Sequence, residues 1–430
     1  MLKKIAFLFV FLTAIHSFAK VLEVGNCIGG ASAQFATIQE AVNAATPGSR
    51  VLVCPGSYAE QVTINKPLTL RGAKLSSTSG ATIIAPQGGV QANTSSLSSG
   101  DPLAAQILVD STWGVRISNL TVDGSNNGLT TCSSPIFIGI FFRNASGVVS
   151  HTAVVNQALG SGDAGCQSGL AIFAQSGNGG SSKVEILNNT VHGYQKNGIT
   201  GNEIGTWVNV ANNTVVGVGP TTGAAENSIQ VGFGAAGKIV GNTAMDDVWS
   251  PDVITDPGDA ASGILVYASG SVLVRENIVA NTQFGIALVT DVTGGPPADN
   301  NEVVENLVSA SHVFDGIEVC SDHNVIRGNT INRSDESGIH LDSTCTNSDS
   351  SATGKGNRLK LNTIDSACTG ILLGTSARAN SIFGNDFFNV GSNSLNADQC
   401  VSPSPLVISH AVRMAGEQGR PSVRPAPARP

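Results

Sequence analysis

Two carboxylates and a histidine in the C-terminal half of the chain have the types and spacing for acid–base chemistry. Glu318 stands two residues after Gly316, and His340 and Asp342 stand two and four residues after Gly338. If these segments are neighbouring parallel strands, the Cα atoms of Glu318 and Asp342 lie ~8 Å apart, from ~4.8 Å across strands and ~6.6 Å along one. Carboxylates separated by ~6.5–9.5 Å can serve as acid and base around a water in inverting glycoside hydrolysis. His340 could then hold a proton or a substrate hydroxyl.

The same residues also fit a structural role, in which Glu318 and His340 simply pair across adjacent strands. Both interpretations are open at this point. Asp322 and His323 follow Glu318 closely and are candidates for substrate binding if the catalytic interpretation holds.

A second candidate is the insertion at 244–262, which contains no Lys or Arg and holds Asp246, Asp247, Asp252, Asp256 and Asp259. Oxygen-rich loops of this kind bind Ca²⁺, although the spacing is not that of an EF-hand. If calcium binds, the expected ligands are Asp246, Asp247, Asp252 and Asp256; the alternative is a solvated acidic loop. Trp249 and Tyr267 could stack on a sugar, or Trp249 could anchor the loop to the body of the protein.

A repeated sequence motif predicts the elements that position these residues. The motif consists of an aliphatic residue, two variable positions, Asn, one variable position and an apolar residue. Its asparagines are Asn189, Asn213, Asn242, Asn277, Asn306, Asn329, Asn362 and Asn385. They are 24, 29, 35, 29, 23, 33 and 23 residues apart. A near-constant period with variable excess predicts a solenoid with one coil per repeat and insertions in loops.

A second motif, Gly-aliphatic-x-apolar, recurs with the same period as the Asn motif. It begins at Gly139, Gly169, Gly198, Gly263, Gly285, Gly316, Gly338 and Gly370, and Ser228 replaces the glycine in one coil. Each coil therefore reads as strand, Asn turn, strand, loop and Gly-led strand. In a Gly-led strand the first and third residues after Gly point inward, and the second and fourth point outward. Asn suits the turn because it tolerates left-handed backbone angles and because stacked amides can hydrogen-bond from coil to coil.

The chain begins with a pattern typical of a secretory signal at 1–19: Lys3 and Lys4, an apolar run and the cleavage motif Ser17-Phe18-Ala19. We expect a repeat domain over 20–403, with an N-terminal cap at about 27–60. Thr37 and Glu40 fit a capping box that starts a short helix with Ile38, Ala41, Val42 and Ala45 on one face. The Pro- and Arg-rich tail at 404–430 is expected to be disordered.

The charge balance argues against nucleic acid and anionic membranes as partners. The chain has 23 basic and 31 acidic residues, a net charge of −8. Without the two signal lysines, and without the tail's four Arg and one Glu, the body is near −13. No second apolar run is long enough to span a bilayer. The eight cysteines of an exported chain predict disulfides, and proximity favours Cys27–Cys54, Cys132–Cys166, Cys320–Cys345 and Cys368–Cys400.

These repeats resemble the right-handed parallel β-helix superfamily typified by pectate lyases. The segment from Phe35 to Gly72 is similar to the start of pectin methylesterase-like members, but the Gln-Asp-Thr and Asp-Phe-Ile-Phe-Gly phrases of those enzymes are absent, as is the Gly-His-Gly of polygalacturonases. The resemblance implies an all-β, single-stranded right-handed parallel β-helix of about ten to twelve coils with an N-terminal capping helix. It transfers no activity residue by residue.

Lyases of this superfamily use a Lys or Arg base and often Ca²⁺. Among the arginines, Arg143 has an outward position, but opposite Asp110, which predicts a salt bridge. Copper-accessory roles, known for other β-helix proteins, need soft or imidazole ligands, and the three Met and few His residues are scattered.

We therefore expect a secreted or periplasmic, monomeric protein that binds or processes polysaccharide on the Gly-led strands, and hydrolysis through Glu318, His340 and Asp342 if it is an enzyme. The alternatives are a non-catalytic surface or adhesion protein and a calcium-dependent polysaccharide lyase.

Overall fold

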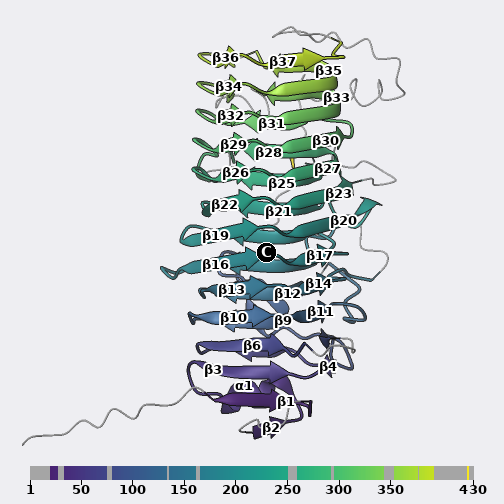
Figure 1. Ribbon diagram of the computed structural model, residues 1–430, viewed down its shortest axis with the longest axis vertical. Coiled ribbons are helices and arrows are strands. Elements are labelled where there is room, and N and C mark those ends of the chain that lie inside the picture. The colour runs from purple at the N-terminus through teal and green to yellow at the C-terminus, as the bar shows by residue number, and fades with distance from the viewer. Residues whose placement is uncertain are drawn as a thin grey trace, which may run out of the picture.

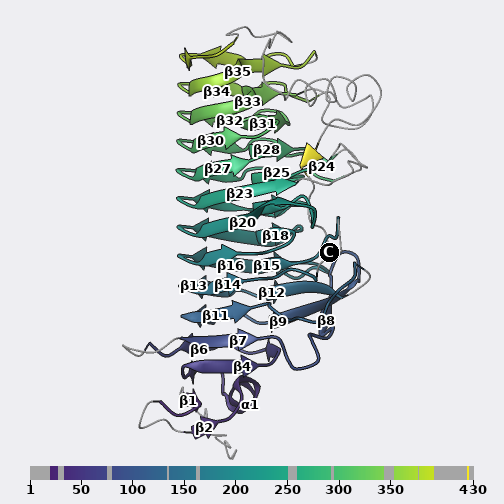
Figure 2. The same ribbon diagram turned by 90° about the vertical axis from the view of Figure 1, so that its right-hand side faces the viewer.

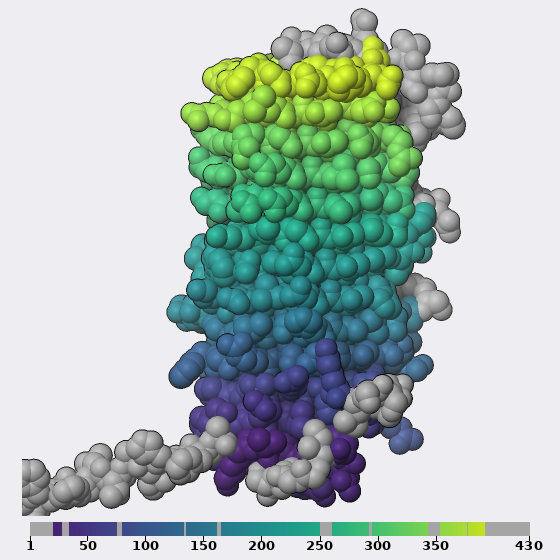
Figure 3. Space-filling model, viewed as in Figure 1, coloured from purple at the N-terminus to yellow at the C-terminus, as the bar shows by residue number. Residues whose placement is uncertain are grey.

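The computed structural model describes residues 20–27, 33–74, 80–132, 135–160, 165–249, 259–291, 295–342, 353–375, 377–391 and 424–425. The signal segment at 1–19 lies outside these residues. The chain forms a column of stacked coils that ascends in sequence order from one end to the other (Figures 1 and 3). Strands of consecutive coils lie side by side, so residues about one repeat apart are neighbours in space.

The N-terminal end of the column is closed as the sequence predicts. Helix α1 (Ile38–Ala44) begins at a capping box in which the Thr37 side chain accepts from the Glu40 N–H and the Glu40 side chain accepts from the Thr37 N–H. The helix buries Ile38, Ala41 and Val42 against the first coil. The helix therefore shields the apolar interior of the first coil from water.

The strands before each Asn turn form the first face of the column. They pair in parallel in the order β2 (Ala33–Phe35), β1 (Val21–Val24), β3 (Ser49–Val53), β6 (Leu68–Gly72), β10 (Val115–Ser118), β13 (Gly147–Ser150), β16 (Ser182–Leu187), β19 (Thr206–Ala211), β22 (Ala236–Val240), β26 (Leu273–Arg275), β29 (Glu302–Val304), β32 (Val325–Arg327), β34 (Arg358–Lys360) and β36 (Ser381–Phe383).

The strands after each Asn turn form the second face. They are β4 (Gly56–Ala59), β7 (Ala81–Ile84), β11 (Leu120–Asp123), β14 (Ala153–Val155), β17 (Thr190–His192), β20 (Thr214–Thr221), β23 (Thr243–Trp249), β27 (Ile278–Thr282), β30 (Leu307–Ser311), the first halves of β33 (Thr330–Leu341) and β35 (Thr363–Leu373), and β37 (Asp386–Phe388).

The Gly-led strands form the third face, called here the Gly-led face. They are β5 (Val62–Ile64), β9 (Pro102–Asp110), β12 (Ile136–Arg143), β15 (Leu170–Gln175), β18 (Asn197–Asn202), β21 (Asn227–Gly232), β25 (Ser262–Tyr267), β28 (Phe284–Val289), β31 (Ile317–Cys320) and the second halves of β33 and β35. The short β8 (Thr94–Ser95) lies antiparallel to β9, and β24 (Asp259–Ala260) pairs with β38 (Arg424–Pro425).

These parallel pairings confirm the expected parallel β-helix. In β33 and β35 one continuous strand crosses from the second face to the Gly-led face, with a register shift between Ser334 and Ser337. The interior, or lumen, is lined by aliphatic residues in register: Ile199, Ile229, Ile264, Ile286, Ile317, Ile339 and Ile371 follow one another from coil to coil, all fully buried. Each buried aliphatic side chain contributes about 1.5–3 kcal/mol.

The glycine that opens each Gly-led strand is required by close packing. A Cβ at Gly285 would lie 2.4 Å from the carbonyl oxygen of Gly316 in the next coil, and a Cβ at Gly316 would lie 2.4 Å from Ile331. Both distances are shorter than any real Cβ contact, so larger residues would force the coils apart.

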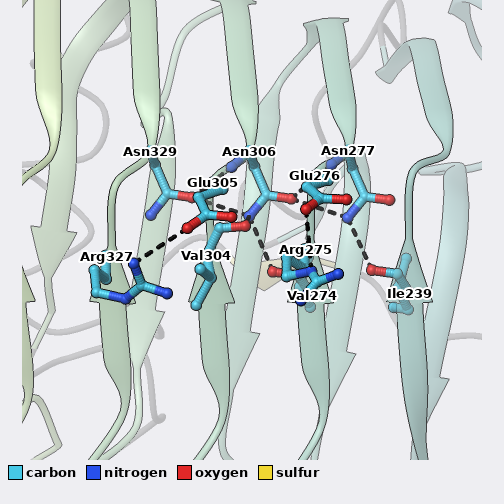
Figure 4. A network of polar contacts seen from close by, with 10 residues as sticks. All are labelled: Ile239, Val274, Arg275, Glu276, Asn277, Val304, Glu305, Asn306, Arg327 and Asn329. Carbon is cyan, nitrogen blue, oxygen red and sulfur yellow. Dashed lines mark hydrogen bonds and ion pairs between the residues drawn. The ribbon is translucent and has the colours of Figure 1, made fainter.

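The repeated asparagines form a hydrogen-bonded ladder along the corner between the first two faces (Figure 4). The backbone N–H and the Nδ2 of Asn306 both donate to Oδ1 of Asn329, at 3.0 and 2.9 Å. Nδ2 of Asn306 also donates to the carbonyl of Val274 in the preceding coil. The same pattern runs from Asn189 to Asn385, which confirms the predicted coil-to-coil amide stacking.

One part of the prediction for this corner was wrong. The left-handed backbone angle falls on the residue before each ladder asparagine, such as Glu276 (φ 55°) and Glu305 (φ 57°), and not on the asparagine itself. The asparagines are therefore selected by their amide hydrogen bonds, while the turn's strained position accepts several residue types.

A second, shorter ladder stands at the corner between the Gly-led face and the first face. Asn301, Asn324, Asn357 and Asn380 follow one another, each backbone N–H donating to Oδ1 of the next. This second ladder was not predicted from the sequence.

Two of the four disulfides predicted from proximity along the chain are present among the described residues. Cys27 is bonded to Cys54, and Cys132 to Cys166. Cys320 and Cys368 are also disulfide-bonded, and their expected partners, Cys345 and Cys400, lie outside the described residues. Disulfides fit a protein that folds in an oxidising compartment. Among the described residues, no helix is long and apolar enough to cross a membrane.

Candidate functional site

The outward side of the Gly-led face, meaning the side chains that point away from the lumen, is buried. From Phe173 to Asp342 its side chains are at most 5% exposed. The alternation predicted from the glycines is correct after Gly198, Gly263, Gly285, Gly316 and Gly338. It was wrong after Gly169, because Ala171 is the residue level with Gly139 and Gly198, so Leu170 packs with Phe173 on the outward side and Ala171 lies in the lumen. The expectation of an open surface was also wrong. The outward side instead has three zones: an apolar cluster around Phe141 and Phe173, a central set of amides, and a second apolar cluster that ends at Cys320.

Glu318 and His340 are neighbours, as the coil register predicts. They are paired positions on β31 and β33, and Nδ1 of His340 lies 3.3 Å from Oε2 of Glu318. A residue that the sequence analysis missed, Asp315, also faces this ring: its Oδ2 lies 3.5 Å from Nδ1 of His340. Its other oxygen accepts from the N–H and Oγ of Ser337 at 3.0 and 2.5 Å.

Asp315, Glu318, Glu336, His340 and Asp342 make up what we call the acidic cluster, and all five are buried. Burial alone would lower the pKa of His340, but the carboxylates of Glu318, Asp342 and Asp315 raise it well above the usual value. The imidazole is therefore a cation that neutralises part of a buried negative charge. Buried charges persist only when they are paired in this way.

The carboxylates are closer together than inverting hydrolysis requires. Oxygens of Glu318 and Asp342 lie within 4.8 Å of each other, shorter than the ~6.5–9.5 Å that leaves room for an attacking water. Sγ of Cys320 lies beside them, 3.2 Å from Oε1 of Glu318, but it is part of a disulfide and has no proton to give.

Asp322 and His323 occupy the corner beside the second asparagine ladder. The N–H of Asp322 donates to Asp299, and Oδ1 of Asp322 accepts from the N–H of Lys355. His323 is exposed, with its ring against Gly356. The contacts of the two residues therefore tie the corner together.

The acidic insertion divides its carboxylates between different partners. Oδ1 of Asp246 accepts from Asn281 at 2.5 Å, whereas Asp247 is fully buried and accepts from Tyr194 at 2.6 Å and from Ser228 at 2.5 Å. Asp252 and Asp256 lie outside the described residues. Calcium binding by this insertion stays a prediction.

Asp247 explains why serine replaces glycine at position 228. Tyr194, Ser228 and Asp247 form a closed hydrogen-bonded triangle, with the carboxyl of Glu226 near enough to interact with Asp247. Burial raises the pKa of Asp247 to about 8 and that of Glu226 as well. The raised pKa values favour the uncharged form of both carboxyls. When Asp247 is protonated, one of its two hydrogen bonds to Tyr194 and Ser228 is donated by the carboxyl, and the bond between the two hydroxyls, which can run either way, allows this.

The two aromatic residues proposed for sugar stacking do not form a surface pair. Tyr267 is 5% exposed and packs against Phe233, with ring centroids 5.2 Å apart. Trp249 is half-buried, and its backbone N–H and carbonyl pair with the Gln283 amide. The backbone of Trp249 therefore holds the end of β23 against the next coil, and a role of its side chain as an anchor or in sugar stacking stays a prediction.

The central zone of the outward side is a network of buried amides. Nδ2 of Asn197 donates to Thr200 and Gln230, Nε2 of Gln230 donates to Asn202, and Nδ2 of Asn227 donates to Asn197. This amide network links β18 and β21 from their first residues, Asn197 and Asn227, to Asn202 at the end of β18.

An open cleft lies directly beyond this network, and we call it the central cleft. It has a volume of about 580 Å³ and is lined by 97–98, 176–180, 203–205, Phe233, Asp291 and 295–296. Ile204 is 73% exposed in it, and Glu203 and Asp291 bring two carboxylates. A cleft of this size falls within the range of small-molecule and saccharide sites, and its lining mixes apolar side chains with hydroxyl, amide and carboxylate groups.

The central cleft was not predicted, although its residues follow a rule. Glu203 and Phe233 are each the fifth residue after the first position of a Gly-led strand, one place beyond the outward pairs. Both have positive φ, 76° and 56°, so the chain turns there and carries the side chain around the corner. The predicted salt bridge between Arg143 and Asp110 is present at 3.3 Å.

Comparison with protein families gives one match. The profile of a family described as periplasmic copper-binding protein (NosD) matches residues 188–401, just under half of the chain. A search of curated proteins found no match.

Several solved structures share the fold at low sequence identity. A GH136 lacto-N-biosidase from Eubacterium ramulus is 13% identical, with a TM-score of 0.53 over 88% of this chain and 67% of that one. The Dettilon tailspike protein is 14% identical, with a TM-score of 0.56 over 82% and 64%. The catalytic domain of a GH87 α-1,3-glucanase, in complex with nigerose, is 15% identical, with a TM-score of 0.52 over 85% and 65%. This chain thus spans about two thirds of their lengths.

The described residues do not form a ligand set suited to copper, the metal in the description of the matching family. Copper sites are built from thiolate, thioether or several imidazole ligands. In the described part of the chain the groups able to hold a metal are carboxylates with one imidazole, or include disulfide-bonded cysteines. His340, the one imidazole, is paired with carboxylates.

Proposed function

We propose, from the premise that the chain is a right-handed parallel β-helix protein of the pectate lyase-like superfamily, that it binds polysaccharide in the central cleft. The observation that carries the proposal is the cleft itself, which opens where the otherwise buried outward side ends. Ile204 offers an exposed apolar surface, and glycines at 177, 179, 180, 205 and 295 leave backbone groups within reach of sugar hydroxyls.

The rigid floor of the cleft supports a binding role. Glu203 follows Asn202, whose amide accepts from Gln230 in the next coil, and Phe233 is packed on Tyr267. Groups held in this way lose little conformational freedom when a ligand binds, so less of the interaction energy is lost to ordering.

Binding is measured by affinity electrophoresis and calorimetry over a panel of neutral and acidic polysaccharides. The double variant Glu203→Gln, Ile204→Ser should weaken binding about tenfold, or about 1.4 kcal/mol. The matched control, Ile278→Ser with Glu302→Gln, replaces an exposed Ile and an exposed Glu on other faces and should leave affinity within twofold. Equal affinities for the two double variants would remove the central cleft as the site.

A second candidate function is hydrolysis, favoured by the two carboxylates that share the central cleft. Glu203 and Asp291 would be the acid and base, and the acidic cluster remains the alternative pair proposed from the sequence. New reducing ends, and ultraviolet absorbance from unsaturated products, report hydrolysis and lyase activity respectively. Loss of reducing ends in Glu203→Gln and Asp291→Asn, but not in Glu318→Gln or Asp342→Asn, assigns the chemistry to the cleft. No products from the native protein on any polysaccharide would leave a non-catalytic binding or adhesion protein.

The place and state of the protein complete the proposal. Export through the segment at 1–19 and a periplasmic or secreted destination agree with the disulfides, and we propose a monomer. Calcium dependence would appear as loss of binding after chelation.

A further inference from the structure

A short strand from the far C-terminal end of the sequence lies on the outward side of the Gly-led face. β38 pairs in parallel with β24, with Arg424 opposite Asp259 and Pro425 opposite Ala260. β38 also contacts β28, and it is the small yellow strand beside β24 in Figure 2. These two residues belong to the tail that the sequence predicts to be disordered, and they are separated from β24 by more than 160 positions.

The residues beneath this strand belong to the second apolar cluster. Ala260 is fully buried and packs with Leu265, Tyr267, Phe284 and Phe314. The cluster borders the acidic cluster at Cys320 and shares Phe233 with the central cleft. A segment lying here therefore occupies the strip between the cleft and the acidic cluster.

Charge complementarity favours the tail as the occupant of this strip. Residues 412–430, which we call the basic segment, carry Arg413, Arg420, Arg424 and Arg429 against one acidic residue, Glu417. The rest of the mature chain is near −13, and Glu203 and Asp291 line the cleft beside the second apolar cluster. A cationic segment tethered to an anionic groove binds at high effective concentration.

The composition of the basic segment suits an extended ligand. Three of its arginines directly precede proline, at 420–421, 424–425 and 429–430. Proline restricts both itself and the residue before it to extended angles, which lowers the entropy lost on binding. Because proline lacks an N–H, it is tolerated at the edge of a sheet, which is where β38 lies.

We propose that the basic segment is an intramolecular ligand of the outward side and that polysaccharide must displace it to bind. The second half of this statement rests on the proposed function, and the first half does not. If the segment occupies the strip nine tenths of the time, it lowers the apparent affinity for polysaccharide about tenfold.

The test compares two full-length charge variants. In one, Arg420, Arg424 and Arg429 are changed to Glu; in the matched control, the exposed Arg50, Arg71 and Arg116 of the first face are changed to Glu. Both variants change the net charge equally. Hydroxyl-radical labelling, read by mass spectrometry, measures the exposure of Tyr267 and Phe314, with the exposed Trp113 as internal reference.

The proposal expects labelling of Tyr267 and Phe314 to rise severalfold in the segment variant and to stay unchanged in the control. A synthetic peptide of residues 412–430 should restore the native labelling of the segment variant, whereas the same peptide with the three arginines replaced by Gln should not. Unchanged labelling in the segment variant, or equal increases in both variants, would overturn the proposal.

Polysaccharide binding separates this inference from the proposed function. The segment variant should bind about tenfold more tightly than the native protein. If labelling responds as expected but no variant binds any polysaccharide, the proposed function fails while the intramolecular contact stands. If affinity is unchanged although labelling rises, the segment contacts the strip without competing, and the displacement half of the proposal is wrong.

Discussion

The Asn corner and the outward side of the Gly-led face belong to the same coils but use polar residues in opposite ways. At the corner one residue type repeats, and each amide meets the same partner in the next coil. On the outward side the polar groups change from coil to coil, from amides at Asn202 and Gln230 to charges at Glu318 and His340. The repeated amides of the corner hold successive coils together, whereas the polar groups of the outward side give each coil different chemistry.

The comparison is tested most severely by removing the buried cation of the acidic cluster. His340→Gln leaves Glu318 and Asp315 without their positive partner and should lower the free energy of unfolding by about 3–5 kcal/mol. Urea unfolding measures it. The control His323→Gln alters an exposed ring and should cost less than about 0.5 kcal/mol. The double variant with Glu318→Gln should recover part of the loss. A cost below about 1 kcal/mol for His340→Gln would mean that the cluster is not a paired-charge site.

The acidic cluster also predicts a pH dependence with a definite sign. The pKa of His340 is raised in the folded protein, so its stabilising charge is fully present below the unfolded value of about 6.5 and is lost as pH rises through the higher folded value. The difference in unfolding free energy between native protein and His340→Gln should shrink with rising pH. A difference that grows with pH would contradict the assignment of His340 as a cation.

Breaking the asparagine ladder should cause the next largest loss of unfolding free energy. Asn306→Ala removes the acceptor of two donors from Asn277. It also removes Nδ2, which donates to Asn329 and to the carbonyl of Val274, but it keeps the backbone N–H that donates to Asn329. At about 1 kcal/mol for each buried hydrogen bond lost, unfolding should become easier by roughly 3–4 kcal/mol at most. Asn385→Ala, at the end of the ladder, is half-buried and removes fewer bonds, so it should cost about 1–2 kcal/mol. Equal costs would show that the rungs act independently of their place.

The Tyr194–Ser228–Asp247 triangle provides a test within the lumen. Because the pKa of Asp247 is raised to about 8, its contribution is greatest below about pH 4 and is lost as pH rises from there to about 8. Asp247→Asn should flatten the fall of stability over that range. Asp246→Asn, the adjacent residue on the strand, is the control and should leave the slope as in the native protein.

The smallest effect is expected at the surface of the Asn corner. Arg327 and Glu305 form an ion pair of 3.2 Å (Figure 4), but both side chains are more than one third exposed. A double-mutant cycle with Arg327→Ala and Glu305→Ala should give a coupling of about 0.2–0.5 kcal/mol that disappears in high salt. A coupling above about 1 kcal/mol would mean that the surface ion pairs, and not only the asparagine ladder, stabilise this corner.

The fold could be predicted from the sequence because its signals are periodic. The Asn and Gly motifs define the coil register, and that register placed Glu318 beside His340 and Arg143 beside Asp110 correctly. The periodic pattern also identified the lumen, since the residues after each Gly alternate between aliphatic and variable positions.

The burial of the candidate site could not be predicted, because burial depends on segments outside the repeat. The segment around Leu97 covers Gln175, to whose side chain its N–H donates, and Phe314 packs on Phe284 from a loop. Asp315 stands just before a Gly and Phe233 just after a strand, so both fall outside the positions that a period of two assigns to a face. Corners turn side chains in ways that strand periodicity does not describe.

The asparagine ladder has a direction. Each rung gives both of its donors to the next coil toward the C-terminus and reaches back with Nδ2 only to a backbone carbonyl. A coil already in place therefore presents two hydrogen atoms with no acceptor until its successor arrives. If the chain folds from its capped N-terminus, each folded coil offers two hydrogen-bond donors to the Asn side-chain oxygen of the next coil. These hydrogen bonds fix the register of the next coil. Folding can then proceed by adding coils one at a time at the C-terminal end of the column.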